Sequence, residues 1–187
     1  EVPLASRVAL LRLARKHRAF TVASFASAEM EEVRRRRLVR LVDLLAVNID
    51  EAAMLGRVSR RAKAETIAAA CAAQVRRLNP GIRLLITNGG RGLYACEKGI
   101  VELLPALQVP VRGTAGAGDA ALAGLMVGTV LGLPFLGRSG SGLSCARLAR
   151  LLSALSVTSA DTIHFGVNRR SLNAFARQHG EPGVRAV

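Results

Sequence analysis

The chain has 187 residues, of which 50% are hydrophobic and 3% aromatic, and its formal net charge is +14 at pH 7. This length and apolar content are enough for one folded domain with its own core, which excludes a chain that is disordered throughout. The positive charge indicates an anionic partner, a membrane surface or a basic exterior.

The apolar pattern along the chain alternates between helix-like and strand-like segments. The expected helices are residues 8–16, 29–42, 51–56, 62–78, 117–131 and 143–155. The expected strands are residues 20–25, 44–47, 83–87, 93–96, 100–103 and 108–112. Repeated β–α units of this kind predict a parallel sheet with helices on both faces. We expect one domain over residues 1–179, with a flexible loop at 137–142 and a disordered tail over 180–187.

The most informative segment is residues 113–121, which read G-T-A-G-A-G-D-A-A. Gly116, Ala117 and Gly118 begin an expected helix, so their N–H groups can close on an anion where the helix dipole favours negative charge. Asp119 follows directly and could take a proton from a substrate hydroxyl, while the N–H groups stabilise the transferring phosphoryl oxygens. The alternative, a tight turn followed by an ordinary first-turn acid, stays open.

Two further segments place polar or glycine residues directly after a strand-like run. Residues 48–51, N-I-D-E, follow the apolar run 44–47, and residues 87–92, T-N-G-G-R-G, follow the run 84–86. Open α/β sheets bind ligands at the carboxyl ends of their strands. The three segments together therefore favour a ligand site over three unrelated turns.

In these three segments the chain resembles the ribokinase-like family of carbohydrate and nucleoside kinases, the PfkB type, whose marks are N-x-x-E, T-x-G-x-x-G and D-T-x-G-A-G-D. The resemblance runs from about Leu4 to about Leu172 and covers the C-terminal part of a family member. It implies a ribokinase-like three-layer α/β/α fold with a mostly parallel central sheet, lacking the amino-terminal strands and the lid. Residues 104–124 and 154–163 look most like the pseudouridine kinase branch.

The family resemblance implies an ATP-dependent phosphotransferase that moves the γ-phosphate to a hydroxyl of a sugar or a pseudouridine-like nucleoside. It makes Asp119 the general base and the amides of Gly116, Ala117 and Gly118 the anion hole. Glu51 would help organise Mg²⁺, largely through water. The implied ATP-binding residues are Asn48, Thr87, Gly89, Gly92, Thr114 and Arg150.

Two positions depart from the family signature. Gly113 stands where the signature has its leading Asp, and Ala115 stands where it has its second Thr. In the family the first position often helps hold a monovalent cation, so the sequence argues against activation by such a cation. The missing amino-terminal part carries most sugar-binding residues of the family. The alternative to an active kinase is therefore a catalytically inactive nucleotide- or RNA-binding fragment.

The densest basic run is residues 34–37 with Arg40, on an expected helix whose first turn holds Glu29, Glu31 and Glu32. Acids at the start and bases at the end suit a helix dipole, so the run predicts a solvated helix face. Nucleic acid binding is the rival interpretation. The basic run contains no aromatic residues interleaved with the arginines, so we do not expect nucleic acid as a partner.

Cys71, Cys96 and Cys145 are widely spaced and form no C-x-x-C pair, which predicts buried, reduced thiols in a cytoplasmic protein. Residues 120–137 carry no charge, but Pro134 interrupts them and several are glycine or alanine. They predict a buried helix packed closely on a sheet rather than a membrane span. A sheet without its neighbouring strands exposes an apolar edge, so we expect self-association.

Overall fold

The computed structural model describes residues 2–137 and 142–184, and the chain forms two compact units. The first unit comprises Glu1–Asn88 and Tyr94–Glu102, and the second comprises Gly89–Leu93 and Leu103–Val187. The sequence predicts one domain over residues 1–179. Each of the two units has a hydrophobic cluster of its own.

The first unit contains an α/β arrangement around a five-stranded sheet, whose strand order is β1-β2-β3-β4-β5. The strands are β1 (Val22–Ser24), β2 (Leu44–Asn48), β3 (Arg83–Thr87), β4 (Leu93–Glu97) and β5 (Ile100–Leu104). The helices are α1 (Leu4–Lys16), α2 (Met30–Arg35), α3 (Ile49–Gly56) and α4 (Ala64–Leu78), with short 3₁₀ turns at Ser27–Glu29 and Leu38–Leu41. A further 3₁₀ turn, Gly89–Arg91, follows β3 and belongs to the second unit. β1 pairs with β2 and β2 pairs with β3, both in parallel. The predicted α/β class with a mostly parallel sheet is confirmed.

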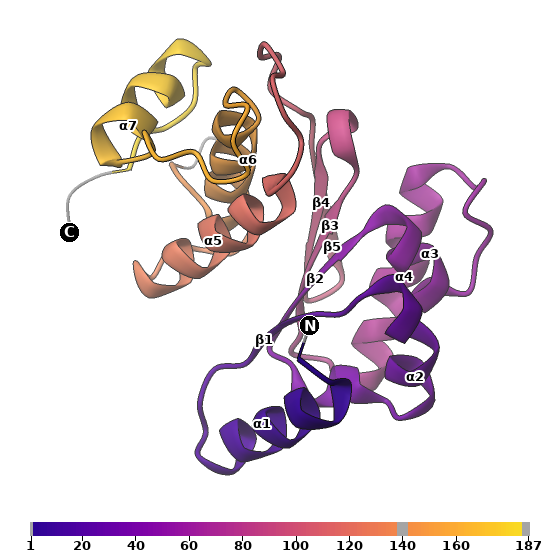
Figure 1. Ribbon diagram of the computed structural model, residues 1–187. Helices are drawn as coiled ribbons and strands as arrows, with labels where there is room; N and C mark the ends of the chain where they lie inside the picture. Colours follow the sequence, from indigo (N-terminus) through magenta and orange to yellow (C-terminus); the bar gives the residue numbers. More distant parts are fainter. Residues whose placement is uncertain (1, 138–141, 185–187) are drawn as a thin grey trace. The chain divides into compact units, whose positions relative to one another are not determined.

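Helices α2, α3 and α4 cover one face of the sheet (Figure 1). Alternate residues of β2 and β3 enter the core under these helices, because successive side chains of a strand point to opposite faces. These residues are Leu45, Val47, Leu84 and Ile86, all at most 3% exposed. The runs that read as apolar strands in the sequence thus supply the sheet side of this core.

The prediction of one helix over residues 29–42 is wrong. α2 ends at Arg35, Arg37 has a left-handed backbone with φ of 53°, and a 3₁₀ turn follows at Leu38–Leu41. Val33, Leu38 and Val39 all enter the same core. In one straight helix these three side chains would not share a face, so the chain changes direction at Arg37.

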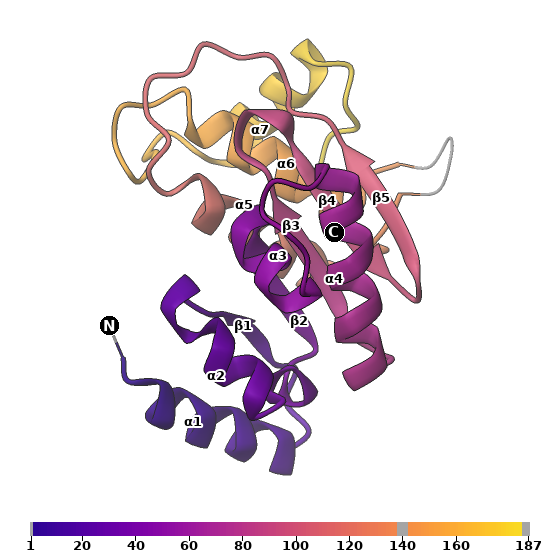
Figure 2. The ribbon, with the colours of Figure 1, turned by 90° about the vertical axis from the view of Figure 1, so that its right-hand side faces the viewer.

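The second unit is built from α5 (Ala117–Val130), α6 (Cys145–Ser156) and α7 (Arg169–Gln178). α5 and α6 lie side by side (Figures 1 and 2). A Cβ added at Gly124 would come within 2.7 Å of Ala149 Cα, so the glycines of α5 are the places where α6 approaches most closely. The predicted close packing of this helix is thus formed, within the second unit, against α6. In residues 2–137 and 142–184 no helix is both long and apolar enough to cross a membrane.

Two segments of the second unit differ from the sequence prediction. Residues 108–112 form no strand, because the N–H groups of Arg112 and Gly113 donate to the Val157 carbonyl beyond the end of α6. α7 is not predicted, although Asn168 caps it by accepting the N–H groups of Arg170 and Ser171. Of the predicted flexible loop, residues 138–141 lie outside the described residues.

The predicted disordered tail begins at residue 180. Asn173 in α7 accepts the Val184 N–H at 2.7 Å and donates to the Val184 carbonyl at 3.0 Å. These two hydrogen bonds hold the chain as far as Val184 against α7. Residues 185–187 lie outside the described residues.

The three cysteines are buried and none of them forms a disulfide, as predicted. Burial raises the pKa of the Cys71 thiol from its ordinary value of 9.0 to about 12, and the nearby Cys96 contributes to that rise. Burial likewise raises the pKa of Cys96 to about 12. Both thiols therefore stay protonated in the folded chain at any physiological pH.

We expect these thiols to react with a disulfide reagent at pH 8 orders of magnitude more slowly in the native chain than in denaturant. Above pH 9 the unfolded chain loses thiol protons that the folded chain keeps until about pH 12. The free energy of unfolding should therefore fall as the pH rises from 9 to 12, and Cys71→Ser with Cys96→Ser should reduce that fall. Rapid, stoichiometric labelling of the native chain would contradict the burial of the thiols.

Candidate functional site

In the first unit, candidate binding residues lie at the carboxyl ends of β2 and β3. Asn48 is the last residue of β2, and Thr87 is the last residue of β3 and its register partner. Asn48 is exposed and Thr87 half-buried, whereas the strand residues just before them are buried. The structure thus places two residues from separate motifs side by side at the sheet edge where α/β proteins bind ligands.

Asn48 and Glu51 form a capping box at the start of α3. The Asn48 Oδ1 accepts the Glu51 N–H at 2.9 Å, and the Glu51 Oε2 accepts the Asn48 N–H at 2.9 Å. Glu51 Oε1 also accepts the Ser27 hydroxyl at 3.0 Å. The N-x-x-E motif therefore has a structural task, which is to turn the end of β2 directly into α3. The three-residue spacing of Asn48 and Glu51 predicts this capping box from the sequence. The hydrogen bond from Ser27 to Glu51 could not be predicted in that way.

Glu51 is the residue from the sequence prediction that could assist a magnesium ion. Its side chain is buried, and both of its carboxylate oxygens already accept hydrogen bonds. Each oxygen keeps a second lone pair, which fits contact with a hydrated ion through water. Within the described part of the chain, no three His, Cys, Asp or Glu residues gather to hold a metal directly. The described residues thus fit Mg²⁺ that is held by ATP phosphates and water. They do not form a site in which protein side chains alone surround the ion.

In the second unit, the candidate binding residues lie in the loop that opens α5. Gly116 precedes the helix with φ of 80°, and a Cβ there would lie 2.2 Å from the Thr162 carbonyl oxygen. Only glycine fits this position, because it combines a left-handed backbone with a close approach of another chain segment. Thr114 accepts the Ala117 N–H at 3.3 Å and Gly116 accepts the Ala120 N–H at 2.8 Å. The loop is therefore fixed by its own backbone and by residue 162.

The N–H groups of Gly118 and Asp119 have no hydrogen-bond partner among the described residues. The Asp119 side chain is exposed and also makes no hydrogen bond or ion pair there. A Cβ added at Gly118 would meet no atom within 4 Å, so the space beside this residue is open. Unpaired N–H groups at a helix N-terminus attract anions, and a carboxylate beside them can accept a proton.

Gly89 and Gly92 have different surroundings, so glycine is needed at each position for a different reason. Gly92 has φ of 104°, and a Cβ there would lie 2.1 Å from the Leu104 carbonyl oxygen. Gly89 has φ of 53° but nothing within 4 Å of an added Cβ. Close backbone packing explains Gly92, whereas the open space at Gly89 leaves room for a ligand.

Arg150 lies in α6 and its guanidinium is held within the second unit. It forms an ion pair with Glu181 and donates to the Pro105 carbonyl at 3.2 Å. Both side chains of the pair are at most 14% exposed. The sequence gives no sign of this pair, because Glu181 falls in the segment predicted to be disordered.

Gly113, at the position of the signature's leading Asp, lies against residues 159–160. A Cβ there would be 3.1 Å from the Ser159 carbonyl oxygen and 3.2 Å from the Ala160 carbonyl oxygen. Space for a carboxylate at this position would require the 159–160 segment to shift. Glycine at this position therefore fits the close approach of the 159–160 segment, and the absence of a monovalent cation site stays a prediction.

Comparison with protein families matches residues 1–168 to the pfkB family carbohydrate kinase model. Comparison with curated proteins by sequence gives no match. Among solved structures, a protein of Clostridium perfringens described as a sugar kinase is 19% identical with a TM-score of 0.77, and the match covers 94% of this chain and 52% of that one.

Two further solved structures are ligand complexes. A nucleoside kinase from Burkholderia thailandensis in complex with inosine is 25% identical with a TM-score of 0.58, covering 84% of this chain and 46% of that one. Ribokinase from Cryptococcus neoformans in complex with ADP is 20% identical with a TM-score of 0.67, covering 94% and 58%. The chain thus spans about half the length of the solved structures that it matches.

Proposed function

Because the chain belongs to the pfkB family of carbohydrate kinases, we propose that it transfers the γ-phosphate of ATP to a hydroxyl group of a sugar or nucleoside. The observation that carries this proposal is the start of α5. An exposed carboxylate at Asp119 there adjoins the unpaired N–H groups of Gly118 and Asp119. Phosphoryl transfer depends on positioning and on charge stabilisation, and this arrangement offers both.

In this proposal Asp119 accepts the proton of the attacking hydroxyl group. The amides of Gly116, Ala117 and Gly118 form an anion hole for the γ-phosphate, with Thr114 beside it on the same loop. Of these, the Ala117 N–H also donates to the Thr114 carbonyl at 3.3 Å, so the unpaired Gly118 N–H is the principal donor. When bound with ATP, Mg²⁺ neutralises charge on the phosphates. Glu51 orients water around that ion from a carboxylate that Ser27 and Asn48 hold in place.

The remaining nucleotide contacts come from the ends of β2 and β3 and from the 3₁₀ turn that follows. Asn48 keeps its side-chain NH₂ group available, because only its Oδ1 serves the capping box. Thr87 offers a hydroxyl and Gly89 an open backbone. For Arg150 we propose a positioning role, because its guanidinium is bound to Glu181 and Pro105. We also propose a positioning role for Gly92, because its lack of a side chain lets the backbone lie close to Leu104.

For the acceptor we propose a nucleoside of the pseudouridine kind. The similarity of residues 104–124 and 154–163 to the pseudouridine kinase branch supports this choice over a free sugar. Pseudouridine and uridine make a matched pair of substrates, because they differ only in which base atom joins the ribose. A strong preference for pseudouridine over uridine and ribose would support this acceptor.

The first experiment is a titration of Mg·ATP into the purified chain by calorimetry, followed by turnover assays with pseudouridine, uridine and ribose on the same sample. We expect micromolar binding of ATP and transfer to one of these acceptors. Binding without transfer to any acceptor would instead support the alternative, an inactive nucleotide-binding chain. Absence of ATP binding would overturn the proposal and return the loop at Gly116 to a purely structural role.

We also propose that the chain associates with a second copy of itself through β5. This strand ends the sheet order, and its side chains Ile100, Val101 and Leu103 are 63%, 39% and 46% exposed. An end strand with exposed apolar residues favours pairing with another chain. Sedimentation velocity should show a rising mean mass over a hundredfold concentration range, and Val101→Lys should suppress it. A monomer at every concentration would contradict self-association.

A further inference from the structure

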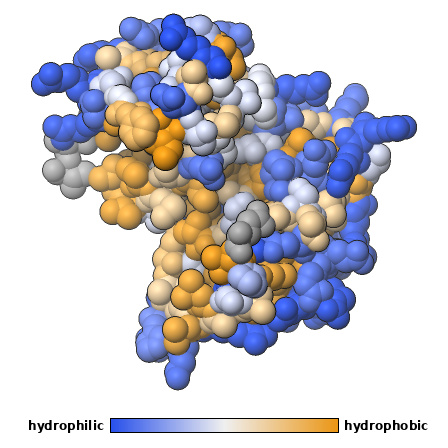
Figure 3. Space-filling model, viewed as in Figure 1, coloured by the Kyte–Doolittle hydropathy of each residue, from blue (hydrophilic) through white to orange (hydrophobic). Residues whose placement is uncertain are grey.

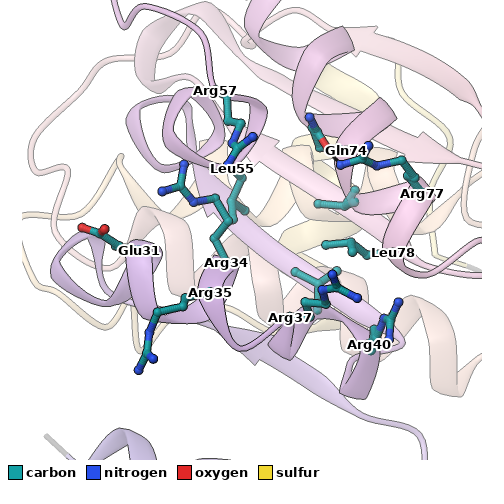
Figure 4. Close-up of a pocket in the computed structure, with 12 residues that line it drawn as sticks. Glu31, Arg34, Arg35, Arg37, Arg40, Leu55, Arg57, Gln74, Arg77 and Leu78 are labelled. Atoms are coloured by element: carbon teal, nitrogen blue, oxygen red, sulfur yellow. Dashed lines mark hydrogen bonds between the residues drawn. The ribbon is translucent and has the colours of Figure 1, made fainter.

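The first unit contains a cationic groove that includes most of the basic run at residues 34–40 and none of the residues of the three family motifs (Figure 4). Its volume is about 570 Å³, which falls within the usual range of roughly 300–1,000 Å³ for small-molecule pockets. It is formed by α2, the Leu38–Leu41 turn, the end of α3 and α4. The charged residues that line it are Glu31, Arg34, Arg35, Arg37, Arg40, Arg57 and Arg77.

The positive charge of the groove is not neutralised by its own lining. In Figure 4, Arg34 and Arg57 lie on one side, Arg77 lies opposite, and Arg37 and Arg40 lie at one end. Arg35 forms an ion pair with Glu32, and its side chain extends away from the groove. The Glu31 side chain also extends away from the groove. Among the described residues, the guanidinium groups of Arg34, Arg37, Arg40 and Arg57 make neither a hydrogen bond nor an ion pair. Arg77 donates only to the neutral Gln74, at 2.9 Å.

Two of these arginines occupy backbone positions that favour glycine. Arg37 follows α2 with φ of 53°, and Arg57 follows α3 with φ of 56°. A side chain in the left-handed region costs on the order of 1–2 kcal/mol, and glycine is the usual residue just after a helix. Arg18 and Lys98, outside the groove, share this conformation. They provide matched controls for the two groove residues.

We propose that this groove binds a small ligand with several phosphate groups in a row. Guanidinium groups remain charged at any physiological pH and bind phosphate oxygens in pairs. Six arginines beside a single carboxylate, Glu31, therefore suit such an anion. The lining contains no aromatic residue on which a base could stack, and the groove has the volume of a small-molecule site. Both facts favour a phosphate chain over single-stranded nucleic acid. The site does not depend on the proposed kinase reaction.

The test is a calorimetric titration with inorganic tripolyphosphate, made in the Gly118→Val background so that the proposed γ-phosphate site does not contribute. The groove variant is Arg37→Gly with Arg57→Gly, and the control is Arg18→Gly with Lys98→Gly. Both pairs remove two positive charges from left-handed positions, where glycine is compatible with the fold. We expect the groove variant to bind at least about tenfold more weakly, and the control to change less than about threefold.

Equal affinity in the groove variant and its parent would overturn the proposal, as would equal losses in the groove variant and the control. Titration with ATP in the same background identifies the source of the phosphates. If ATP and tripolyphosphate bind with equal affinity, the groove recognises only the phosphate chain. If ATP binds more tightly, the ligand of the groove is a nucleoside triphosphate. Binding of a 15-nucleotide RNA without binding of tripolyphosphate would replace the small ligand with nucleic acid and overturn the proposal.

Discussion

Replacement of Asp119 with Asn is expected to reduce phosphoryl transfer by roughly 100- to 10,000-fold, the usual contribution of a general base. The affinity for ATP should hardly change, because the substitution keeps the shape of the side chain and the backbone amides. Asp119 is exposed and has no partner in the described residues, so the variant breaks no contact. Loss of the favourable charge at the start of α5 costs about 0.3–1 kcal/mol of stability.

The measurement is kcat and KM for the best acceptor, together with calorimetric ATP affinity and thermal unfolding. A fall in kcat at constant ATP affinity and near-constant stability is the signature of a lost base. Asp50→Asn is the matched control, because Asp50 is an exposed carboxylate in the first turn of α3. Similar rates for the Asp119 variant and the parent would exclude Asp119 as the base.

Two neighbouring glycines should separate ligand binding from folding. Gly118→Val places a side chain in open space, so the fold should remain within about 1 kcal/mol of the parent. That side chain would stand in front of the free amides, so ATP binding should weaken by at least about tenfold. Ala123→Val, at an exposed position one turn further along α5, controls for the added volume.

Gly116→Ala should have the opposite pattern and destabilise the chain by about 1–3 kcal/mol or more. It forces alanine into a left-handed backbone and directs its Cβ against the Thr162 carbonyl at 2.2 Å. Thermal unfolding with ATP titration on both variants checks the pair. Unchanged ATP affinity in Gly118→Val would remove the anion hole from the mechanism, whatever the result at Gly116.

The sequence predicts well those parts of the fold that depend on local patterns. β3 is Arg83–Thr87 as predicted, because the apolar run is short and bounded by Asn79-Pro80-Gly81 on one side and by glycines on the other. The ends of β2 and β3 carry the polar residues expected of a ligand site, since parallel strands present their carboxyl ends at one edge. α5 begins at Ala117, as the glycine loop predicts.

Features that depend on distant residues could not be predicted in this way. The break at Arg37 is set by the core that Leu38 and Val39 must reach, not by the helix propensity of the arginines. The Arg150–Glu181 pair and the Ser27 contact to Glu51 join segments far apart in the sequence. The groove depends on Arg57 and Arg77 being brought to the run at 34–40 by the packing of α3 and α4. Periodicity within a short window carries no information on such partners.

The contact between Gly116 and Thr162 also bears on the order in which the chain folds. The turn at Gly116 is supported by a carbonyl from a segment beyond the end of α6, so its shape is not encoded within the turn alone. Contacts between residues remote in sequence form late, because a long loop must close first. We therefore expect α5 to acquire helical structure early, and its first amides to reach their final orientation only when residues 159–162 dock. A nascent chain still lacking that segment would contain the glycine motif without a finished anion site.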